Sequence, residues 1–438
     1  WATGSRFSRA DVDVRIWSTL GLIGAAAITP VHFAGRTATG QLVFLTAALV
    51  AALVTLGEAI YRRQRLDRVP LSLAIWWILG FGVALVQVAP LPADWLVWLS
   101  PRTWEVVKNV EHVPRLAESW KTLSLEPAGT LLGVATFCGY SLIFWTAWQV
   151  LRTPRDFQRV TWGVGLVLSA WALQGVAQQM LPNGRFCWLW PHSLRSADEY
   201  LCGPFSNRNH YAQFLSLGIG PLLWIGLHDR VGQADARPGR HRVGDPFPAL
   251  RGWVAWGLAF WLIAVAFATS SRGGAVAIGC ILSATVLLMA LSRMISPGML
   301  AGLALVVIAG GTLATQSSAG HSLAARLEKA DTNSRWIIWK ANWEVWQDFP
   351  WFGTGIGTHA DAHLLKMKVV DPGRIFTHAE SGYLQVASET GVAGLLVLGG
   401  ILLTVLGRTA WAWSRQRSRA GWMAAAGLLT AFAGHLSH

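Results

Sequence analysis

One histidine in the sequence has the position and the chemistry expected of a catalytic group. His378 stands just before a long apolar segment, and Glu380 follows it by two residues. Histidine is the side chain whose ordinary pKa lets it accept a proton near neutral pH, so an imidazole at the mouth of a helix is a candidate general base. The carboxylate of Glu380 is the alternative base, and a hydrogen-bonded structural histidine is the alternative interpretation of His378.

Three arginines lie in short sequences that suit the binding of an anion. Arg208 follows Asn207 in a polar cluster at the start of an apolar segment. Arg272 lies in the tight connection 270–274, and Arg335 stands at the beginning of a tryptophan-rich helix. A guanidinium can hold two phosphate oxygens at once, and the N-terminus of a helix favours negative charge. These positions predict phosphate binding, whereas an ordinary helix cap or contact with lipid headgroups is the competing interpretation.

Another polar cluster has the spacing of metal ligands. His359 and His363 are four residues apart with Asp361 between them, so on a helix the two imidazoles would share one face and could bind zinc. The third ligand would point away from that face. We therefore expect no metal and no cofactor.

These candidate residues lie between long apolar segments. Of the 438 residues, 53% are apolar and only 13% are charged, whereas soluble domains carry about 25% charged residues. This composition excludes a soluble multi-domain enzyme, a disordered scaffold and a coiled coil. A helix needs about 20 mostly apolar residues to cross a membrane, and runs of this length are too long and too continuous for barrel strands. The runs lie near residues 17–35, 41–60, 71–92, 128–150, 160–181, 210–227, 252–270, 274–292, 298–316, 383–407 and from 421 onward.

The apolar runs predict an all-α, polytopic integral membrane protein with about eleven transmembrane helices and a twelfth beyond the end of the chain. We expect residues 1–438 to form one membrane domain of a longer polypeptide. The net charge of +13 comes largely from arginines in loops that fall on one side of the membrane if the helices alternate, such as 62–68, 152–159 and 408–419. That pattern marks the cytoplasmic side, so the positive charge does not predict a nucleic-acid partner.

The opposite side receives three long connections, 93–127, 182–209 and 317–382. The last is the largest, and we expect short amphipathic helices within it. Tryptophans recur there on one helical face, at Trp336, Trp339, Trp343 and Trp346. Cys187 and Cys202 share the second connection, and a disulfide between them depends on whether that side of the membrane is oxidising.

Several of these segments, taken together and in this order, resemble the O-antigen ligase and polysaccharide polymerase superfamily of bacterial membrane glycosyltransferases. The resemblance covers roughly residues 120 to 400. It is carried by Leu123 to Pro127, Phe205 to Asn209, Ser271 to Gly274, Arg335 with Trp339, the Pro350, Gly353 and Gly355 turn, and His378 through Tyr383 to Gln385.

The resemblance implies a reaction on the periplasmic face of the inner membrane. A glycan carried on undecaprenyl diphosphate would be transferred to a hydroxyl of an acceptor, either another glycan or the lipid A core. It implies that His378 is the general base and that Arg208, Arg272 and Arg335 bind the diphosphate without a metal. Asn207 and Tyr383 belong to the same motifs, and we assign them to substrate binding as well. Glu380 departs from the family, which often carries asparagine at that position.

Two other functions share many of these features. A flippase or transporter of lipid-linked sugars would also have many spans and a cationic lumen. Transporters tend to carry ionisable groups at mid-membrane and repeated halves, whereas here only Glu58 and Glu389 are acidic within apolar runs and no repeat is evident. A protein O-oligosaccharyltransferase of the same superfamily would differ only in its acceptor. The sequence leaves open whether the product is a ligated or a polymerised chain.

Overall fold

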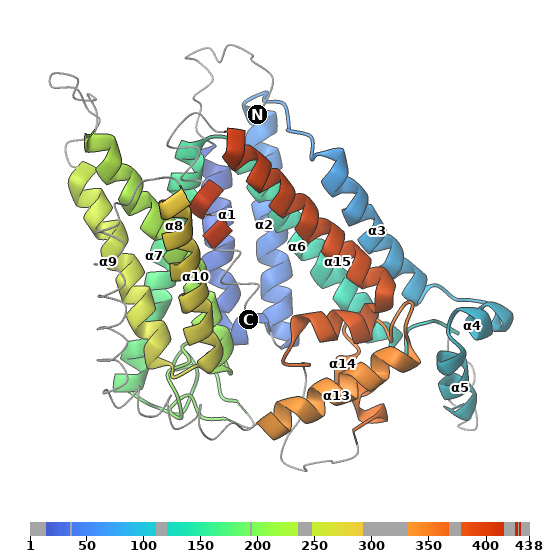
Figure 1. Cartoon of the computed structure of the whole chain (residues 1–438). Helices are drawn as coiled ribbons and strands as arrows, with labels where there is room; N and C mark the ends of the chain where they lie inside the picture. The colour runs from blue at the N-terminus through green and yellow to red at the C-terminus, as the bar shows by residue number, and fades with distance from the viewer. Residues whose placement is uncertain are drawn as a thin grey trace. The chain divides into compact units, whose positions relative to one another are not determined.

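The computed structural model is built of helices (Figure 1). It describes residues 15–35, 37–110, 121–192, 195–234, 248–291, 332–367, 378–415, 425–427 and 429–430. The α-helices are α1 (Ile16–Ile28), α2 (Ala38–Tyr61), α3 (Leu71–Val88), α4 (Ala93–Leu99), α5 (Pro101–Val110), α6 (Pro127–Val150), α7 (Pro154–Met180), α8 (Arg208–Ala234), α9 (Pro248–Ala268), α10 (Arg272–Leu291), α13 (Thr332–Asp348), α14 (His359–Ala362) and α15 (Gly382–Arg415). Short 3₁₀ turns occur at Thr29–Val31, Phe33–Gly35 and His363–Leu365. Within these ranges there is no β-strand, and the predicted all-α fold is confirmed.

The predicted apolar runs agree with the helices wherever the structure describes them. Nine of the eleven runs fall in the described ranges, and each corresponds to a helix. The run 298–316 and nearly all of the last run lie outside the described residues. Seven of the described helices are long and apolar enough to cross a membrane. The chain is therefore a multi-pass membrane protein.

The first predicted run, 17–35, differs from its helix. The α-helix α1 ends at Ile28, and two 3₁₀ turns follow. Pro30 lies in the first of these turns and has no backbone N–H to continue the helical ladder. Phe33 and Ala34 then adopt positive φ angles of 52° and 51°. The chain thus leaves the helix within the apolar run, a change that hydrophobicity alone does not reveal.

The chain divides into two compact units. The first unit comprises Trp1–Asp67, Gly139–Ala324 and Ala412–His438, and the second comprises Arg68–Cys138 and Ala325–Trp411. Each is described below through its own residues.

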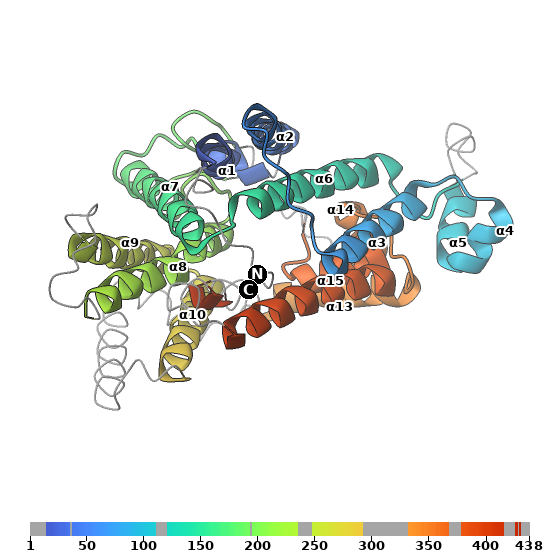
Figure 2. The ribbon, with the colours of Figure 1, turned by 90° about the horizontal axis from the view of Figure 1, so that it is seen from above.

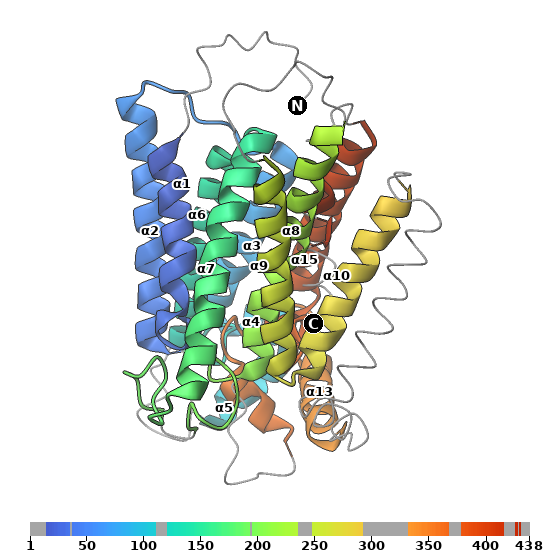
Figure 3. The same cartoon turned by 90° about the vertical axis from the view of Figure 1, so that its left-hand side faces the viewer.

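The core of the first unit lies where α8 packs against α7, α9 and α10 (Figure 3). Leu168, Leu215, Ile219, Leu262 and Ile278 are among its fully buried side chains. Within a bilayer this packing is stabilised by van der Waals contacts between the helices, because lipid tails are as apolar as these side chains. This packing sets the ends of α8 and α10 side by side, which matters for the arginines that begin both helices.

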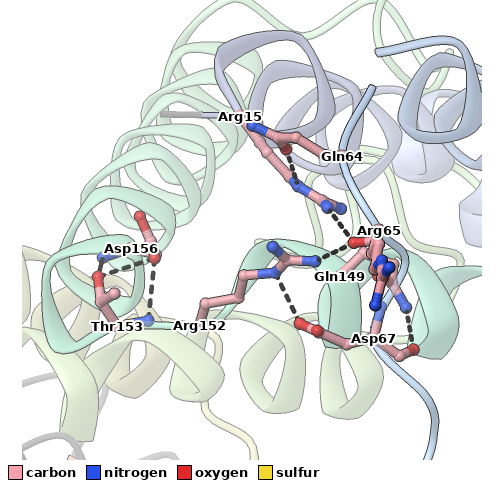
Figure 4. A network of polar contacts seen from close by, with 8 residues as sticks. All are labelled: Arg15, Gln64, Arg65, Asp67, Gln149, Arg152, Thr153 and Asp156. Carbon is pink, nitrogen blue, oxygen red and sulfur yellow. Dashed lines mark hydrogen bonds and ion pairs between the residues drawn. The ribbon is translucent and has the colours of Figure 1, made fainter. Parts of the chain in front are cut away.

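One end of the first unit is held by a polar network (Figure 4). Arg15 and Arg152 both donate to the carbonyl oxygen of Arg65, at 3.3 Å and 3.2 Å. Arg152 also pairs with the carboxylate of Asp67 at 2.7 Å. The buried amide of Gln149 bonds both backbone groups of Asp67, accepting from its N–H at 2.9 Å and donating to its carbonyl at 2.8 Å. Two arginine-rich segments that we predicted on one side of the membrane therefore meet.

The two cysteines of the 182–209 connection are separate thiols. Both Cys187 and Cys202 are free, and Cys202 is buried. Burial raises the pKa of the Cys187 thiol to about 11 and that of Cys202 to about 12. Thiols with such pKa values remain protonated near neutral pH and are poor nucleophiles.

In the second unit, the predicted connection 93–127 contains two helices that the sequence analysis did not resolve. α4 and α5 lie beside each other beyond the end of α3 (Figures 1 and 2). Trp98 of α4 is 81% exposed. An exposed tryptophan on a short helix of a membrane protein is typical of a segment at headgroup depth.

α13 buries a face that differs from the predicted tryptophan stripe. Its buried side chains include Ile338, Ala341 and Val345, spaced by three and four residues. Trp336 and Trp343 are 62% and 47% exposed. The tryptophans therefore flank the packed face of α13 instead of forming it.

Candidate functional site

A glycine turn forms the base of a tightly bonded cluster in the second unit. Gly353, Gly355 and Gly357 have φ angles of 67°, 112° and 82°, a region that other residues rarely adopt. A Cβ atom at Gly355 would lie 2.5 Å from the hydroxyl oxygen of Ser124, and one at Gly353 would overlap the backbone of Glu389. The alternating glycines thus allow the turn to lie directly against neighbouring segments.

The turn docks into a break in α15. Gly391 has a φ of 62° and a ψ of −159°, which interrupts the helix near its first third. The backbone groups around the break bond the 350–355 segment instead of their own helix. The bonds run from Thr354 N to Ser388 O (3.0 Å), Gly355 N to Glu389 O (2.9 Å), Val392 N to Pro350 O (2.8 Å) and Ala393 N to Trp351 O (3.1 Å). They fix the turn to the beginning of α15.

The carboxylate of Glu389 holds the turn from within the cluster. The residue is 7% exposed, and one of its oxygens accepts the backbone N–H of Gly357 at 3.0 Å. The other oxygen accepts the N–H of His359 at 3.3 Å and the side-chain amide of Gln385 at 3.1 Å. Glu389 therefore fixes the chain at Gly357 and at His359.

Gln87 of α3 completes the same cluster. Its buried amide donates to the carbonyl oxygens of Phe352, at 2.6 Å, and Glu389, at 2.8 Å. Its own oxygen accepts the N–H of Ile356 at 3.1 Å. Sequence analysis missed Gln87. Its position within the apolar run 71–92 was nevertheless a signal, because a buried amide needs polar partners.

His359 is held in one tautomer by a side chain of α13. The Nδ1 atom of His359 lies 3.0 Å from Oδ1 of Asn342, whose Nδ2 donates to the carbonyl of Ile338 at 2.8 Å. Because Oδ1 can only accept, the imidazole carries its proton on Nδ1. The ring stacks on that of His363, with centroids 4.9 Å apart. The predicted shared face of these two histidines is therefore observed.

The surroundings of His359 keep its imidazole neutral. The residue is 2% exposed, and desolvation by burial, followed by the nearby His363 and His378, lowers its pKa to about 3. Asp361 points to the exposed side of the same turn. Within the described part of the chain, no group of three or more histidine, cysteine or carboxylate side chains is placed to hold a metal ion.

We expect the protein to lose stability in acid because of His359. In the unfolded chain an imidazole has a pKa of about 6.5 and takes up a proton as the pH falls, whereas the folded state resists protonation down to a pKa of about 3. Between these values the unfolded state binds more protons, so lowering the pH favours unfolding. The measurement is the melting temperature in detergent across this pH range, in wild type and in His359→Asn. The variant lacks the titrating ring and should lose less stability, and an equal loss in both proteins would contradict the assignment.

The structure places His378, Glu380 and Tyr383 together at the beginning of α15. His378 is exposed and lies four residues before Gly382, the first residue of the helix. Glu380 has a φ of 53°, and Tyr383 is 47% exposed. The predicted position just before a span is the observed one. Their roles in catalysis and substrate binding stay predictions.

Asn207 and Arg208 lie at the start of α8 in the first unit. The side-chain oxygen of Asn207 accepts the N–H of Asn209 at 2.9 Å, as expected of a cap. Arg208 is the first residue of the helix, and its guanidinium lies over the ring of Tyr200, 4.3 Å from the centroid. The ring face orients the cation at the helix N-terminus.

Arg272 is the first residue of α10 and follows a connection of only three residues after α9. The hydroxyl of Ser271 accepts the N–H of Gly274 at 3.0 Å and donates to the side chain of Asn209 at 2.8 Å. This bond joins the N-termini of α8 and α10, so Arg208 and Arg272 begin two packed helices at the same end of the first unit. Two guanidiniums at adjacent helix N-termini suit the binding of phosphate oxygens. Arg335 lies in the first turn of α13 in the second unit, and its side chain lies outside the described residues.

Part of the chain matches a known protein family. Residues 257–399 match the family model described as O-antigen ligase. This segment contains Arg272, the glycine turn and His378. No curated protein matches the chain. Over these residues, the match confirms the predicted resemblance of this multi-pass membrane protein to O-antigen ligases.

Proposed function

We propose that this protein transfers a glycan from an undecaprenyl-diphosphate carrier to an acceptor hydroxyl on the periplasmic face of the bacterial inner membrane. The observation that carries the proposal is that the segment matching O-antigen ligase includes both an arginine at a helix N-terminus, Arg272, and the exposed His378 before α15. Another glycan or the lipid A core would supply the acceptor hydroxyl.

The proposed reaction assigns simple roles to these side chains. The acceptor oxygen attacks the anomeric carbon of the donor sugar and gives its proton to the imidazole of His378. The bond from that carbon to the diphosphate oxygen breaks, and the diphosphate leaves with the electron pair. Arg208 and Arg272, with Arg335, would bind the diphosphate oxygens as their charge increases. Because diphosphate is a good leaving group, the reaction needs no general acid.

The experiment that tests the proposal supplies the purified protein in lipid nanodiscs with a synthetic undecaprenyl-diphosphate-linked glycan and an acceptor glycan. We expect a new glycosidic product and free undecaprenyl diphosphate in equal amounts. A nucleotide sugar carrying the same glycan is the control donor and should give none. Product from the nucleotide sugar alone, or no product from either donor, would contradict the proposed donor.

We expect transfer to continue in excess EDTA, because arginines can neutralise the diphosphate without a divalent cation. The measurement is the initial rate in the nanodisc assay before and after chelation. A loss of activity that Mg²⁺ or Zn²⁺ restores would contradict this prediction. It would favour a metal site at His359, Asp361 and His363 instead.

Lipid-linked intermediates in a deletion strain would identify the acceptor class. A ligase mutant should accumulate long chains on the carrier, and a polymerase mutant only single repeats. A repeat confined to the cytoplasmic leaflet would instead favour a flippase. A transporter would use acidic residues within its spans, which here are Glu58 and Glu389. Both have partners within the protein: Glu58 accepts a hydrogen bond from Ser18 and pairs with Arg62, and Glu389 accepts a hydrogen bond from the glycine turn.

A further inference from the structure

The polar network at one end of the first unit contains two arginines that share one acceptor. Arg15 and Arg152 both donate to the carbonyl oxygen of Arg65, at 3.3 Å and 3.2 Å, and their guanidiniums converge on that oxygen (Figure 4). Arg15 precedes α1, Arg65 follows α2, and Arg152 lies between α6 and α7. Three separate parts of the chain therefore bring two positive charges to one place.

Arg15 is the buried member of this pair. It is 6% exposed, and its Nε donates to the side-chain oxygen of Gln64 at 3.0 Å. Its Nη1 is also buried, and within the described part of the chain no atom accepts a hydrogen bond from it. An arginine stays protonated in proteins, and a buried cation without an anionic partner is costly. The described residues thus leave one donor of a buried cation without an acceptor.

The carboxylates near Arg15 pair with other cations. Asp67 lies 2.7 Å from Nε of Arg152, and Glu58 lies 3.2 Å from Nε of Arg62. Burial, followed by the neighbouring charge of Arg152, lowers the pKa of Arg15, although Asp67 and Glu58 act in the opposite direction. Three arginines therefore meet two carboxylates, and this group of side chains keeps a net positive charge.

The arginine pair lies where apolar helices end. The candidate span α2 ends at Tyr61, and the candidate spans α6 and α7 are separated only by residues 151–153. Tyr61 is 88% exposed, and Trp17, two residues after Arg15, is 63% exposed. Exposed aromatic rings at the ends of spans are typical of headgroup depth. At that depth the phosphate groups of phospholipids are the anions that meet the protein.

We propose that Arg15 and Arg152 bind the phosphodiester of an anionic phospholipid at this end of the first unit. Phosphate oxygens would accept from Nη1 of Arg15 and from Arg152, whose side chain is 32% exposed and can be reached from the lipid. The exposed side chains of Arg63 and Arg65 add positive charge that attracts the headgroup. This lipid site is independent of the proposed glycan transfer.

The test measures lipid binding to the purified full chain in detergent. Native mass spectrometry with added phosphatidylglycerol gives the dissociation constant, and phosphatidylcholine, which has a phosphodiester but no net charge, is the comparison lipid. We expect wild type to prefer phosphatidylglycerol about tenfold, because two arginines meet its charge. Arg15→Gln and Arg152→Gln should each weaken phosphatidylglycerol binding about tenfold, since each loses hydrogen bonds from a cation to phosphate.

Arg155→Gln is the matched control. It removes one positive charge from an exposed side chain in the first turn of α7 and should change the dissociation constant less than about twofold, because an exposed charge outside the pair is screened. If the melting temperature shows that Arg15→Gln does not fold, Arg152→Gln, which changes a partly exposed side chain, carries the test. Wild-type binding by folded Arg152→Gln would overturn the proposal, as would equal weakening by Arg155→Gln.

Inorganic phosphate distinguishes a lipid headgroup from a small anion. A large molar excess of phosphate should leave phosphatidylglycerol bound to wild type, because the site lies at headgroup depth. Displacement of the lipid by phosphate would assign the arginine pair to a small anion from solution and overturn the lipid assignment. Equal affinity of wild type for phosphatidylcholine and phosphatidylglycerol would overturn it as well.

Discussion

His378→Ala should abolish glycan transfer while leaving the protein folded and inserted. The variant removes the proposed base, and general-base catalysis contributes about 10²- to 10⁴-fold to a rate. Because His378 is exposed, its loss creates no cavity and should not change the melting temperature. The measurement is the rate of product formation from the lipid-diphosphate donor at saturating acceptor.

The matched variant for this experiment is Glu380→Gln, which changes the neighbouring carboxylate while keeping its size. If His378 is the base, Glu380→Gln should keep most of the activity. An inactive Glu380→Gln protein together with an active His378→Ala protein would move the base to Glu380. Loss of activity in both would show that the two side chains act together.

Arg272→Ala should lower transfer by about 100- to 1000-fold, the usual consequence of removing an electrostatic donor from a developing negative charge. Arg272 begins α10 after a connection of three residues, so its backbone has little freedom to move away from the helix N-terminus. Lysine keeps the charge but loses the planar fork that grips two oxygens, so Arg272→Lys should also fall well below wild type.

Donor binding and transfer rates for both Arg272 variants, in detergent and in nanodiscs, provide the measurement. Arg155→Lys is the control, because Arg155 is an exposed arginine at the start of α7. If Arg272 only contacted lipid headgroups, lysine would serve as well, because it reaches the interface and carries the same charge. Wild-type rates for Arg272→Lys would therefore reduce this residue to an anchor at the membrane surface.

Helices and their order could be predicted from the sequence because burial in lipid imposes one strong requirement, a continuous apolar run. The prediction of helix ends and of short helices was less accurate, because local backbone chemistry and helix length also determine them. α1 ends at Ile28 because Pro30 interrupts the helical ladder inside an apolar run, and α4 and α5 are too short to show as spans. The break at Gly391 could not be predicted either, because glycine is common in membrane helices and does not by itself indicate a break.

The local positions of the candidate site could also be predicted, because they depend on neighbours in sequence. His378 lies just before α15, and Arg208 and Arg272 begin their helices. The cluster of buried polar residues around the glycine turn could not be predicted, because Gln87, Asn342 and Glu389 come from segments far apart in the chain. Many of their partners are backbone groups, which the residue types do not reveal. A polar residue in an apolar run indicates that a partner exists but does not say which one.

The break in α15 has a consequence for how deeply this helix enters the membrane and when it can do so. From Gly391 to Arg415 there are 25 residues, or roughly 37 Å of helix, enough by itself to cross about 30 Å of hydrocarbon. The preceding turns are free to remain in the headgroup region, where their backbone groups meet the 350–355 segment. During synthesis that segment emerges before α15 does. An unpaired backbone group in hydrocarbon costs several kcal/mol, so we expect the residues around Gly391 to enter the membrane only when their backbone groups are hydrogen-bonded to the 350–355 segment.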